Sequence, residues 1–112
     1  AGLDYWQHLN VTYYESIDDF FLKNKNANMV FLSSHGTRHH WDITFKDNQF
    51  LVFGKESVGL PKQLIKDHPE ALFKIPLYSK HVRSLNLANA VSIVTYEGLR
   101  QLKITQDLES LF

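Results

Sequence analysis

The fold is decided by the stretch Phe50-Leu51-Val52-Phe53-Gly54-Lys55-Glu56-Ser57-Val58-Gly59-Leu60-Pro61. An apolar run is followed at once by a loop with two glycines, and a proline then stands where a helix can begin. We therefore predict a buried strand over Gln49 to Phe53, a loop over Gly54 to Pro61 and a helix over roughly Lys62 to Asp67. A strand that leads through a glycine-bearing loop into a helix is typical of an α/β protein.

Strands and helices alternate along the rest of the chain as well. Further strands are predicted where β-branched, aromatic and aliphatic residues gather, at Val11 to Tyr14, Met29 to Ser33, Asp42 to Phe45 and Phe73 to Ile75. Ser16 should cap a helix that ends within Lys23 to Asn26. A last helix, from Leu85 to about Leu102, is apolar on more than one face, which indicates burial on several sides or contact with a partner subunit. We expect one α/β domain over residues 1–112, with a mainly parallel sheet flanked by helices.

The composition excludes several classes of function. Lys and Arg together number 12, as do Asp and Glu, so any contact with nucleic acid must come from a local patch and not from the overall charge. The chain has no cysteine, which removes disulfides, thiolate nucleophiles and cysteine zinc sites. Its apolar runs are too short to cross a bilayer, and it opens without a signal sequence. A soluble, cytoplasmic protein is expected.

Polar or glycine-bearing segments follow the predicted strands. They are Leu32 to Gly36, Phe53 to Pro61, and Ile75 through Ala90. Because ligands bind beyond the carboxyl ends of parallel strands, these segments together predict a pocket. Gly54 and Gly59 either let the backbone approach a ligand closely or simply make a turn, and the spacing leaves both interpretations open. The pattern matches neither a dinucleotide-binding nor a phosphate-binding glycine loop.

Other candidate residues also have two interpretations. Ser84 or Asn86 could cap the last helix, or could contact a ligand. No acid lies between Glu70 and Glu97, whereas four basic or histidine residues do, so this segment either holds phosphates or is an ordinary solvated loop. Tyr96 and Glu97 are unusual in an apolar helix, and are either satisfied core groups or groups that face the site. The histidines are not spaced as metal ligands, and no metal is predicted.

Several motifs occur together in a fixed order. They are Ala1-Gly2-Leu3-Asp4-Tyr5, Phe53-Gly54-Lys55-Glu56-Ser57-Val58-Gly59-Leu60-Pro61, Ile75-Pro76, Arg83-Ser84-Leu85-Asn86-Leu87-Ala88-Asn89-Ala90-Val91-Ser92 and Tyr96-Glu97. In this combination the chain resembles the SPOUT-class (SpoU/TrmH-like) RNA 2'-O-methyltransferases, and most closely the small YibK/TrmL type. The likeness runs from residue 1 to about residue 103.

The resemblance implies a deep C-terminal trefoil knot that binds S-adenosylmethionine largely through backbone groups. The matching cofactor positions are Leu32, Gly54, Ile75, Ser84, Leu85 and Asn86. Tyr96 is expected to orient the nucleotide in catalysis, and the RNA contacts are expected at His35, Lys80 and Arg83. The implied reaction is methyl transfer to the ribose 2'-hydroxyl of the wobble nucleotide, position 34, of certain tRNAs, carried out by a homodimer.

The chain departs from the family pattern at two places. The family's opening strand and its catalytic arginine segment do not occur in it, so we expect an N-terminally truncated domain that binds the cofactor but does not transfer the methyl group. Val58 also stands where some relatives carry arginine. Two alternatives therefore stay open, namely a non-catalytic module that binds RNA or the cofactor, and a structural fragment.

Overall fold

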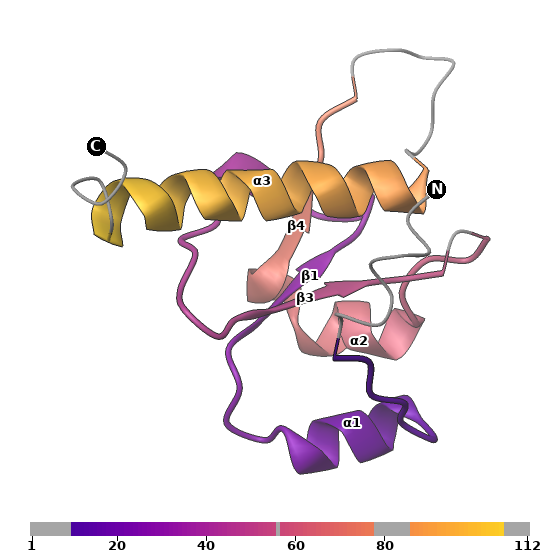
Figure 1. Cartoon of the computed structure of the whole chain (residues 1–112). Coiled ribbons are helices and arrows are strands. Elements are labelled where there is room, and N and C mark those ends of the chain that lie inside the picture. The colour runs from indigo at the N-terminus through magenta and orange to yellow at the C-terminus, as the bar shows by residue number, and fades with distance from the viewer. Residues whose placement is uncertain (1–9, 56, 78–85, 107–112) are drawn as a thin grey trace.

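The computed structural model describes residues 10–55, 57–77 and 86–106, and it contains a four-stranded parallel sheet. Its strands, in the spatial order β2-β4-β1-β3, are β1 (Met29–Leu32), β2 (Arg38–His39), β3 (Phe50–Phe53) and β4 (Leu72–Lys74). The helices are α1 (Ile17–Lys23), α2 (Lys62–Asp67) and α3 (Leu87–Gln106), with short 3-10 turns η2 (His40–Asp42) and η3 (Pro69–Ala71). Figure 1 shows α3 on one side of the sheet and α1 and α2 on the other. The predicted mainly parallel α/β architecture is confirmed.

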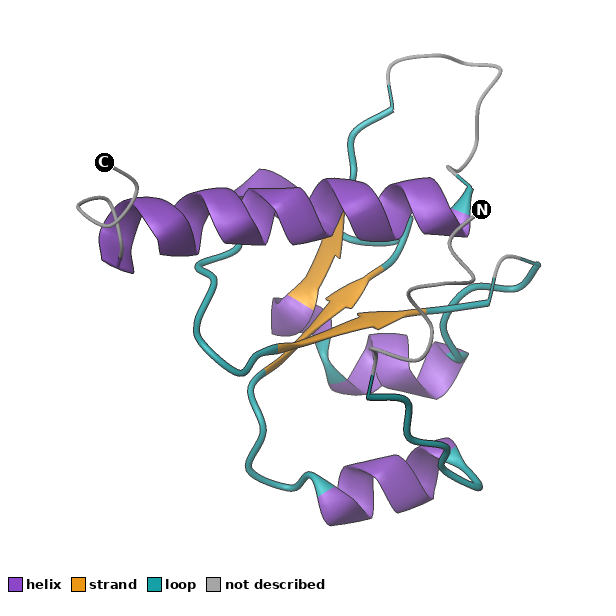
Figure 2. Cartoon of the chain, in the orientation of Figure 1, coloured by secondary structure: helices purple, strands orange, loops and turns teal. Residues whose placement is uncertain are grey.

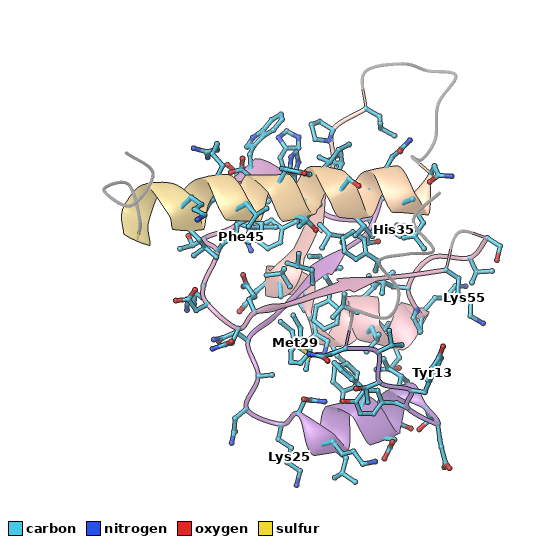
Figure 3. All side chains as sticks on the ribbon, in the orientation of Figure 1. Tyr13, Lys25, Met29, His35, Phe45 and Lys55 are labelled. Atoms are coloured by element: carbon cyan, nitrogen blue, oxygen red, sulfur yellow. The ribbon has the colours of Figure 1, made fainter. Side chains whose placement is uncertain are left out.

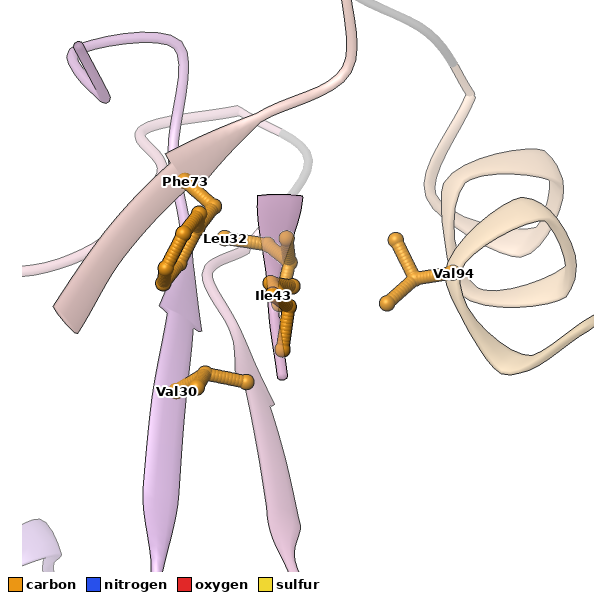
Figure 4. Packing of buried hydrophobic residues seen from close by; sticks show 5 residues of the cluster. All are labelled: Val30, Leu32, Ile43, Phe73 and Val94. Atoms are coloured by element: carbon orange, nitrogen blue, oxygen red, sulfur yellow. The ribbon is translucent and has the colours of Figure 1, made fainter. Parts of the chain in front are cut away.

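The two faces of the sheet bury different side chains, because successive residues of a strand point to opposite sides. The core between the sheet and α3 holds Val30, Leu32, Ile43, Phe73 and Val94 (Figure 4). The core on the α1 and α2 side holds Phe31, Leu60, Leu64 and Leu72. Alternate residues of β1 thus belong to alternate cores, as its continuous apolar sequence requires for a strand buried on both faces.

Helix starts follow from local capping. The Ser16 hydroxyl accepts a hydrogen bond from the backbone N–H of Asp19 at 3.1 Å, so α1 begins where the sequence predicts. Helix α2 begins directly after Pro61 and spans the predicted residues. The last helix begins two residues later than predicted, because the Asn86 side chain caps it by accepting a hydrogen bond from the N–H of Ala88 at 2.8 Å.

The strand predicted at Asp42 to Phe45 is wrong, and the edge strand β2 lies a few residues earlier. The Asp42 carboxylate accepts a hydrogen bond from the N–H of His39, and this bond favours the tight turn of η2. Beyond η2 the backbone is extended at Ile43, but its partner is a side chain: the Gln101 amide accepts from the N–H of Phe45 at 3.1 Å and donates to the carbonyl of Ile43 at 2.9 Å.

The strand predicted at Val11 to Tyr14 is also wrong, since residues 10–14 have no regular structure. The Tyr14 ring packs edge-on against Phe20 of α1, with centroids 5.1 Å apart. Val11 and Tyr13 stay exposed. In the described part of the chain, no strand pairs with residues 11–14, so their β-propensity does not lead to a strand. The segment instead packs against α1 through Tyr14.

Helix α3 is buried along one side only within this chain. Val94 is completely buried, whereas Val91, Ile93 and Leu99 are 37% to 46% exposed. The apolar residues that the sequence places on a second face therefore remain exposed on the described protomer. Among the described residues, neither α3 nor any other helix is both long enough and apolar enough to cross a membrane.

Candidate cofactor and RNA site

The strand register brings the polar segments to one edge of the sheet. Leu32 is level with Phe53 of β3 and with Phe73 of β4. All the strands are parallel, so the segments that leave β1, β3 and β4 emerge side by side, and Figure 2 shows the arrowheads of β1 and β4 pointing toward α3. The N–H of Ser33 also donates to the carbonyl of Phe73 at 2.9 Å, which holds the first residue of the β1 turn against β4.

The side chains of Leu32 and Ile75 belong to the core and not to a pocket. Leu32 is 8% exposed, and Ile75 packs against the same cluster beneath α3. The Leu32 side chain is therefore not available to a ligand in this structure, and the Ile75 side chain is half-buried. What these positions can offer a ligand is the main chain that continues from them, in residues 33–36 and 75–77, where Ser34, His35 and Leu77 are exposed.

Gly54 is required by the loop itself. A Cβ at this position would lie 2.1 Å from the carbonyl carbon of Gly59 and 2.3 Å from the nitrogen of Leu60. The loop closes on itself because the N–H of Gly59 donates to the carbonyl of Lys55 at 2.8 Å, and Gly59 has a φ of 71°, which favours glycine. The structure thus gives the turn interpretation a physical basis at both glycines, and Lys55, Val58 and Gly59 of the loop are exposed.

A pocket of about 410 Å³ adjoins this loop on the α1 and α2 side. It is lined by residues between Gly54 and Pro61 and by Ile17, Val52, Phe53, Lys62 and Leu64. Its walls are largely apolar, with the lysines Lys55 and Lys62 at its margin. Gly54 is the predicted cofactor residue that contributes to it, whereas Leu32, Ile75 and Asn86 do not line it. This volume lies within the range of small-molecule pockets.

His35 and Asn86 are both exposed. His35 is exposed in the turn after β1, beneath the first half of α3 (Figure 3), and its N–H donates to the Ser33 hydroxyl at 3.1 Å. The next residue, Gly36, passes so close to β4 that a Cβ would lie 2.6 Å from the carbonyl carbon of Phe73. Asn86 uses its side-chain oxygen as the α3 cap, which supports the capping interpretation and leaves the amide nitrogen as its ligand donor.

The remaining predicted site residues lie outside the described residues. These are Ser84 and Leu85 of the cofactor set and Lys80 and Arg83 of the RNA set. His81, in the same basic segment, also lies outside them.

Tyr96 and Glu97 face in different directions. Tyr96 is 72% exposed on the outer side of α3, away from the fully buried Val94, and it does not line the pocket beside Gly54. Glu97 turns inward and accepts hydrogen bonds from Arg100 at 3.0 and 2.8 Å and from Gln101 at 2.8 Å. These bonds lower the pKa of Glu97 to about 2. Glu97 is therefore a satisfied, ionised structural group.

A polar connection joins α3 to η2, and Glu97 is the member of it that the sequence marks as a possible satisfied core group. It consists of Glu97 and Gln101 on α3, the backbone of Ile43 and Phe45, and the buried His40. Burial lowers the pKa of His40, against the opposing attraction of the Glu97 carboxylate. The sequence does not indicate that His40 or Gln101 takes part in it. The described residues contain no group of three His, Asp or Glu placed to hold a metal ion.

We predict that Gln101→Leu will lower the free energy of unfolding by about 1–3 kcal/mol, because the Phe45 N–H and the Ile43 carbonyl would lose their partner. Gln63→Leu is the matched control. Gln63 also bonds an acid four residues away, Asp67, but it is exposed and this bond stays within α2. Its cost should stay below about 0.5 kcal/mol. Equal midpoints in urea for the two variants would contradict the role given to Gln101.

Comparison with known proteins defines the class to which this fold and site belong. The SpoU rRNA Methylase family model matches residues 1–96, so the chain belongs to that family. The tRNA (cytidine(34)-2'-O)-methyltransferase of Escherichia coli strain K12 is 37% identical over 103 residues, which are 91% of this chain and 65% of that protein. Four further bacterial relatives, 40% to 42% identical, are matched over 61% to 66% of their length, so the chain spans less than two thirds of them.

Solved structures agree with this membership. A structure described as giving insights into the 2-OH methylation of C/U34 on tRNA superposes with a TM-score of 0.84 and is 37% identical, covering 91% of this chain and 66% of that chain. An AdoMet-bound rRNA methyltransferase from Sinorhizobium meliloti superposes with a TM-score of 0.66 and is 30% identical, covering 77% of this chain and 33% of that chain.

Proposed function

We propose that this domain serves the transfer of a methyl group from S-adenosylmethionine to the ribose 2'-hydroxyl of the wobble nucleotide, position 34, of tRNA, by binding the cofactor and orienting the nucleotide. One observation carries the proposal: Leu32 pairs in register with Phe53 and with Phe73. The segments that follow these three strands therefore start together at one edge of the sheet. Family membership and the name of the 37% identical Escherichia coli relative support the reaction and the substrate. The cytoplasm is the compartment that a tRNA substrate implies.

The residues present fit a nucleoside cofactor. The turns after β1 and β3 are exposed. A ligand can therefore reach their backbone N–H and C=O groups. Leu32, Gly54 and Ile75 would contribute main-chain groups and Asn86 its amide, with Ser84 and Leu85 completing the set that the family resemblance implies. When bound, the cofactor supplies a sulfonium group from which the methyl carbon is readily transferred.

The protein's own contribution is orientation. Tyr96 is our candidate for positioning the nucleotide, and its exposure means that the nucleotide, or a partner subunit, approaches from the outer side of α3. His35 is exposed beside the carboxyl end of β1, where it can contact RNA. Lys80 and Arg83 are proposed to hold phosphates by charge. Holding the attacking oxygen in line with the methyl carbon is the principal source of rate in such a transfer.

Two finer features belong to the same proposal. We infer that α3 completes a trefoil knot, which is supported by its position over the strand ends on the opposite side of the sheet from α1 and α2 (Figure 1). We also infer a homodimer, because the outer side of α3 exposes Val91, Leu99 and Tyr96 by 38%, 46% and 72%. An exposed apolar strip on a helix is a typical contact surface.

A cofactor titration followed by a methylation assay tests the proposed function. We expect the chain to bind S-adenosylmethionine. If the assay shows methyl transfer, we expect the acceptor to be a tRNA whose position 34 is unmodified. Binding without incorporation of a labelled methyl group would favour the non-catalytic module. Absence of binding by calorimetry would contradict the proposed function at its first step.

We predict that Tyr96→Phe spares cofactor binding but lowers the rate of methyl incorporation into tRNA by about tenfold or more, since the hydroxyl that orients the nucleotide is lost. Tyr13→Phe is the control, because Tyr13 is 86% exposed on a segment that covers α1. The measurement is the rate of methyl incorporation into tRNA, in an assay in which the protein without the substitution shows methyl transfer. Equal rates for both variants would remove Tyr96 from the mechanism.

A further inference from the structure

Trp41 is an exposed tryptophan on an otherwise polar part of the surface. Its side chain is 47% exposed, and within the described stretch from Met29 to Lys55 it is the only large hydrophobic side chain that is exposed. A single exposed apolar residue is ordinary by itself. The position of Trp41 in the fold and the groups around it give this one a specific use.

Trp41 lies at the edge of the sheet where the cofactor segments begin. Strand β2 is parallel to β4, and Arg38 and His39 pair in register with Phe73 and Lys74. Trp41 comes two residues after the end of β2, in η2, which contacts both β4 and α3. Because adjacent strands are about 5 Å apart, the segment after β2 starts next to the segment after β4. The structure therefore adds a fourth segment to the three that the sequence predicts at this edge.

Two histidines orient the indole ring of Trp41. The His39 ring contacts it with centroids 4.9 Å apart and an angle of 66° between the ring planes, and the His40 ring does so at 5.2 Å and 53°. His40 is buried, so the indole packs against a fixed part of the protein. Neither histidine ring is stacked flat on the indole. The protein thus orients the indole and leaves exposed surface on which a flat ring can stack.

The groups around Trp41 favour an anionic partner over an apolar one. From residue 33 to residue 44 the chain has one arginine, three histidines and a single acid, Asp42. The exposed Arg38 donates a hydrogen bond to the main-chain carbonyl of Glu70, a neutral acceptor, so this bond does not cancel its positive charge. A protein partner is typically bound by a contiguous apolar patch. An exposed aromatic ring beside a cation instead suits an unpaired nucleotide, whose base stacks on the ring while its phosphate contacts the cation.

We propose that Trp41 stacks on an unpaired base of the RNA substrate, and that Arg38 contacts a phosphate of the same strand. The inference rests on the proposed function and deepens it, since it assumes that RNA is bound at the carboxyl edge of the sheet. It gives the RNA a further contact beside β4, in addition to His35 after β1 and Tyr96 on α3. A base inside a duplex cannot stack on a side chain without leaving the helix, so Trp41 selects a nucleotide in a loop, such as one that flanks position 34.

Binding of an anticodon stem-loop RNA, measured by the fluorescence anisotropy of a label on the RNA, tests the stacking role. We expect Trp41→Ala to raise the dissociation constant by about tenfold or more. Trp41→Phe keeps an aromatic face and should stay within about threefold of the unmodified sequence. Trp41→Leu keeps apolar bulk without an aromatic face, so it should lose affinity as the alanine variant does. The leucine variant also replaces the alanine variant if the latter does not fold.

The fluorescence of Trp41 reports stacking directly. The chain has two tryptophans, Trp6 and Trp41, so Trp6→Phe leaves Trp41 as the only one. In this variant the stem-loop should quench the tryptophan emission, whereas a fully paired duplex RNA should not. Trp41→Ala should accordingly change the affinity for the duplex by less than about twofold. Arg38→Gln should weaken both RNAs alike, because a phosphate contact does not depend on whether the base is paired.

Tyr13→Ala is the matched control, because it removes an aromatic ring that is 86% exposed on the α1 side, and it should keep the RNA affinity within about twofold. The proposal is overturned if Trp41→Ala binds the stem-loop as tightly as the unmodified sequence, or if Trp41→Leu binds it as well as Trp41→Phe. It is also overturned if light scattering shows that Trp41→Ala loses only self-association while its RNA affinity is kept. If the unmodified sequence did not bind the stem-loop, the proposed function itself would be contradicted, so the two failures are distinguishable.

Discussion

Gly54→Val is expected to raise the dissociation constant for S-adenosylmethionine by at least about tenfold, an effect of about 1.4 kcal/mol. The added Cβ would overlap the backbone of Gly59 and Leu60 at 2.1 and 2.3 Å, and backbone cannot rotate out of the way. The loop must therefore move, although Leu60 anchors it in the core with Leu64. The displaced loop would no longer present its amides beside β1 and β4, and calorimetric titration would measure the loss.

Gly98→Ala is the control for this prediction. Gly98 is also a buried glycine, but its Cβ would meet the ring of Phe45 at 2.8 Å, and a side chain can yield where backbone cannot. This variant should bind the cofactor within about twofold of the unmodified sequence, since Gly98 lies on the core-facing side of α3 and its added Cβ changes only packing. If Gly54→Val bound as well as Gly98→Ala, the loop after β3 would not belong to the cofactor site.

Phe31→Ala is expected to lower the free energy of unfolding by about 3–5 kcal/mol. Phe31 is 1% exposed at the centre of β1, and its ring stacks on His68 with centroids 4.5 Å apart. Removing it would leave a cavity between the sheet and α2, in the cluster that also contains Leu60, Leu64 and Leu72. For a domain of ordinary stability, such a loss is a large part of the total, and urea unfolding would measure it.

Tyr13→Ala provides the matched aromatic control, because Tyr13 is 86% exposed. Its cost should stay within about 0.5 kcal/mol. If Phe31→Ala lowered the free energy of unfolding by less than about 1 kcal/mol, the core on the α1 and α2 side would be loosely packed. That core would then not fix the positions of Leu60 and of the loop before it.

Helix starts and buried strands are the parts of the fold that the sequence predicts best. Ser16 caps α1 and Asn86 caps α3 through bonds within three residues of each cap, so local chemistry suffices. The apolar runs at Met29 to Leu32 and Phe50 to Phe53 form strands, as their lack of alternation predicts, and the structure pairs these two strands. Because the strands are parallel, the gathering of the post-strand segments at one edge was also predictable.

Features that depend on distant partners were not predictable. The extended segment near Ile43 looks like a strand in the sequence, but the Gln101 amide, 58 residues away, takes the place of a neighbouring strand. Nothing near Gln101 in the sequence marks it for this role. Likewise, the helical periodicity alone could not decide that Glu97 points inward to Arg100 while Tyr96 points outward, because the apolar residues of α3 occupy more than one face.

The role of Gly54 shows a different limit of prediction from the sequence. Spacing alone could not separate a turn from a ligand contact at Gly54, and the structure supplies the steric reason for a turn. The two interpretations are compatible, because Lys55, Val58 and Gly59 of the closed loop remain exposed. The cofactor residues Leu32 and Ile75 are similar, with side chains held in the core beneath α3 and main chain that continues to the exposed edge.

The most direct measurement is a backbone-amide NMR titration of the chain with S-adenosylhomocysteine. If atoms from the segments after β1, β3 and β4 surround the ligand together, the amide signals of residues 33–36, 55–59 and 75–77 should all shift, and with a single dissociation constant. Shifts confined to one of these segments, or found only around α1 and α2, would contradict a cofactor site at the carboxyl edge of the sheet.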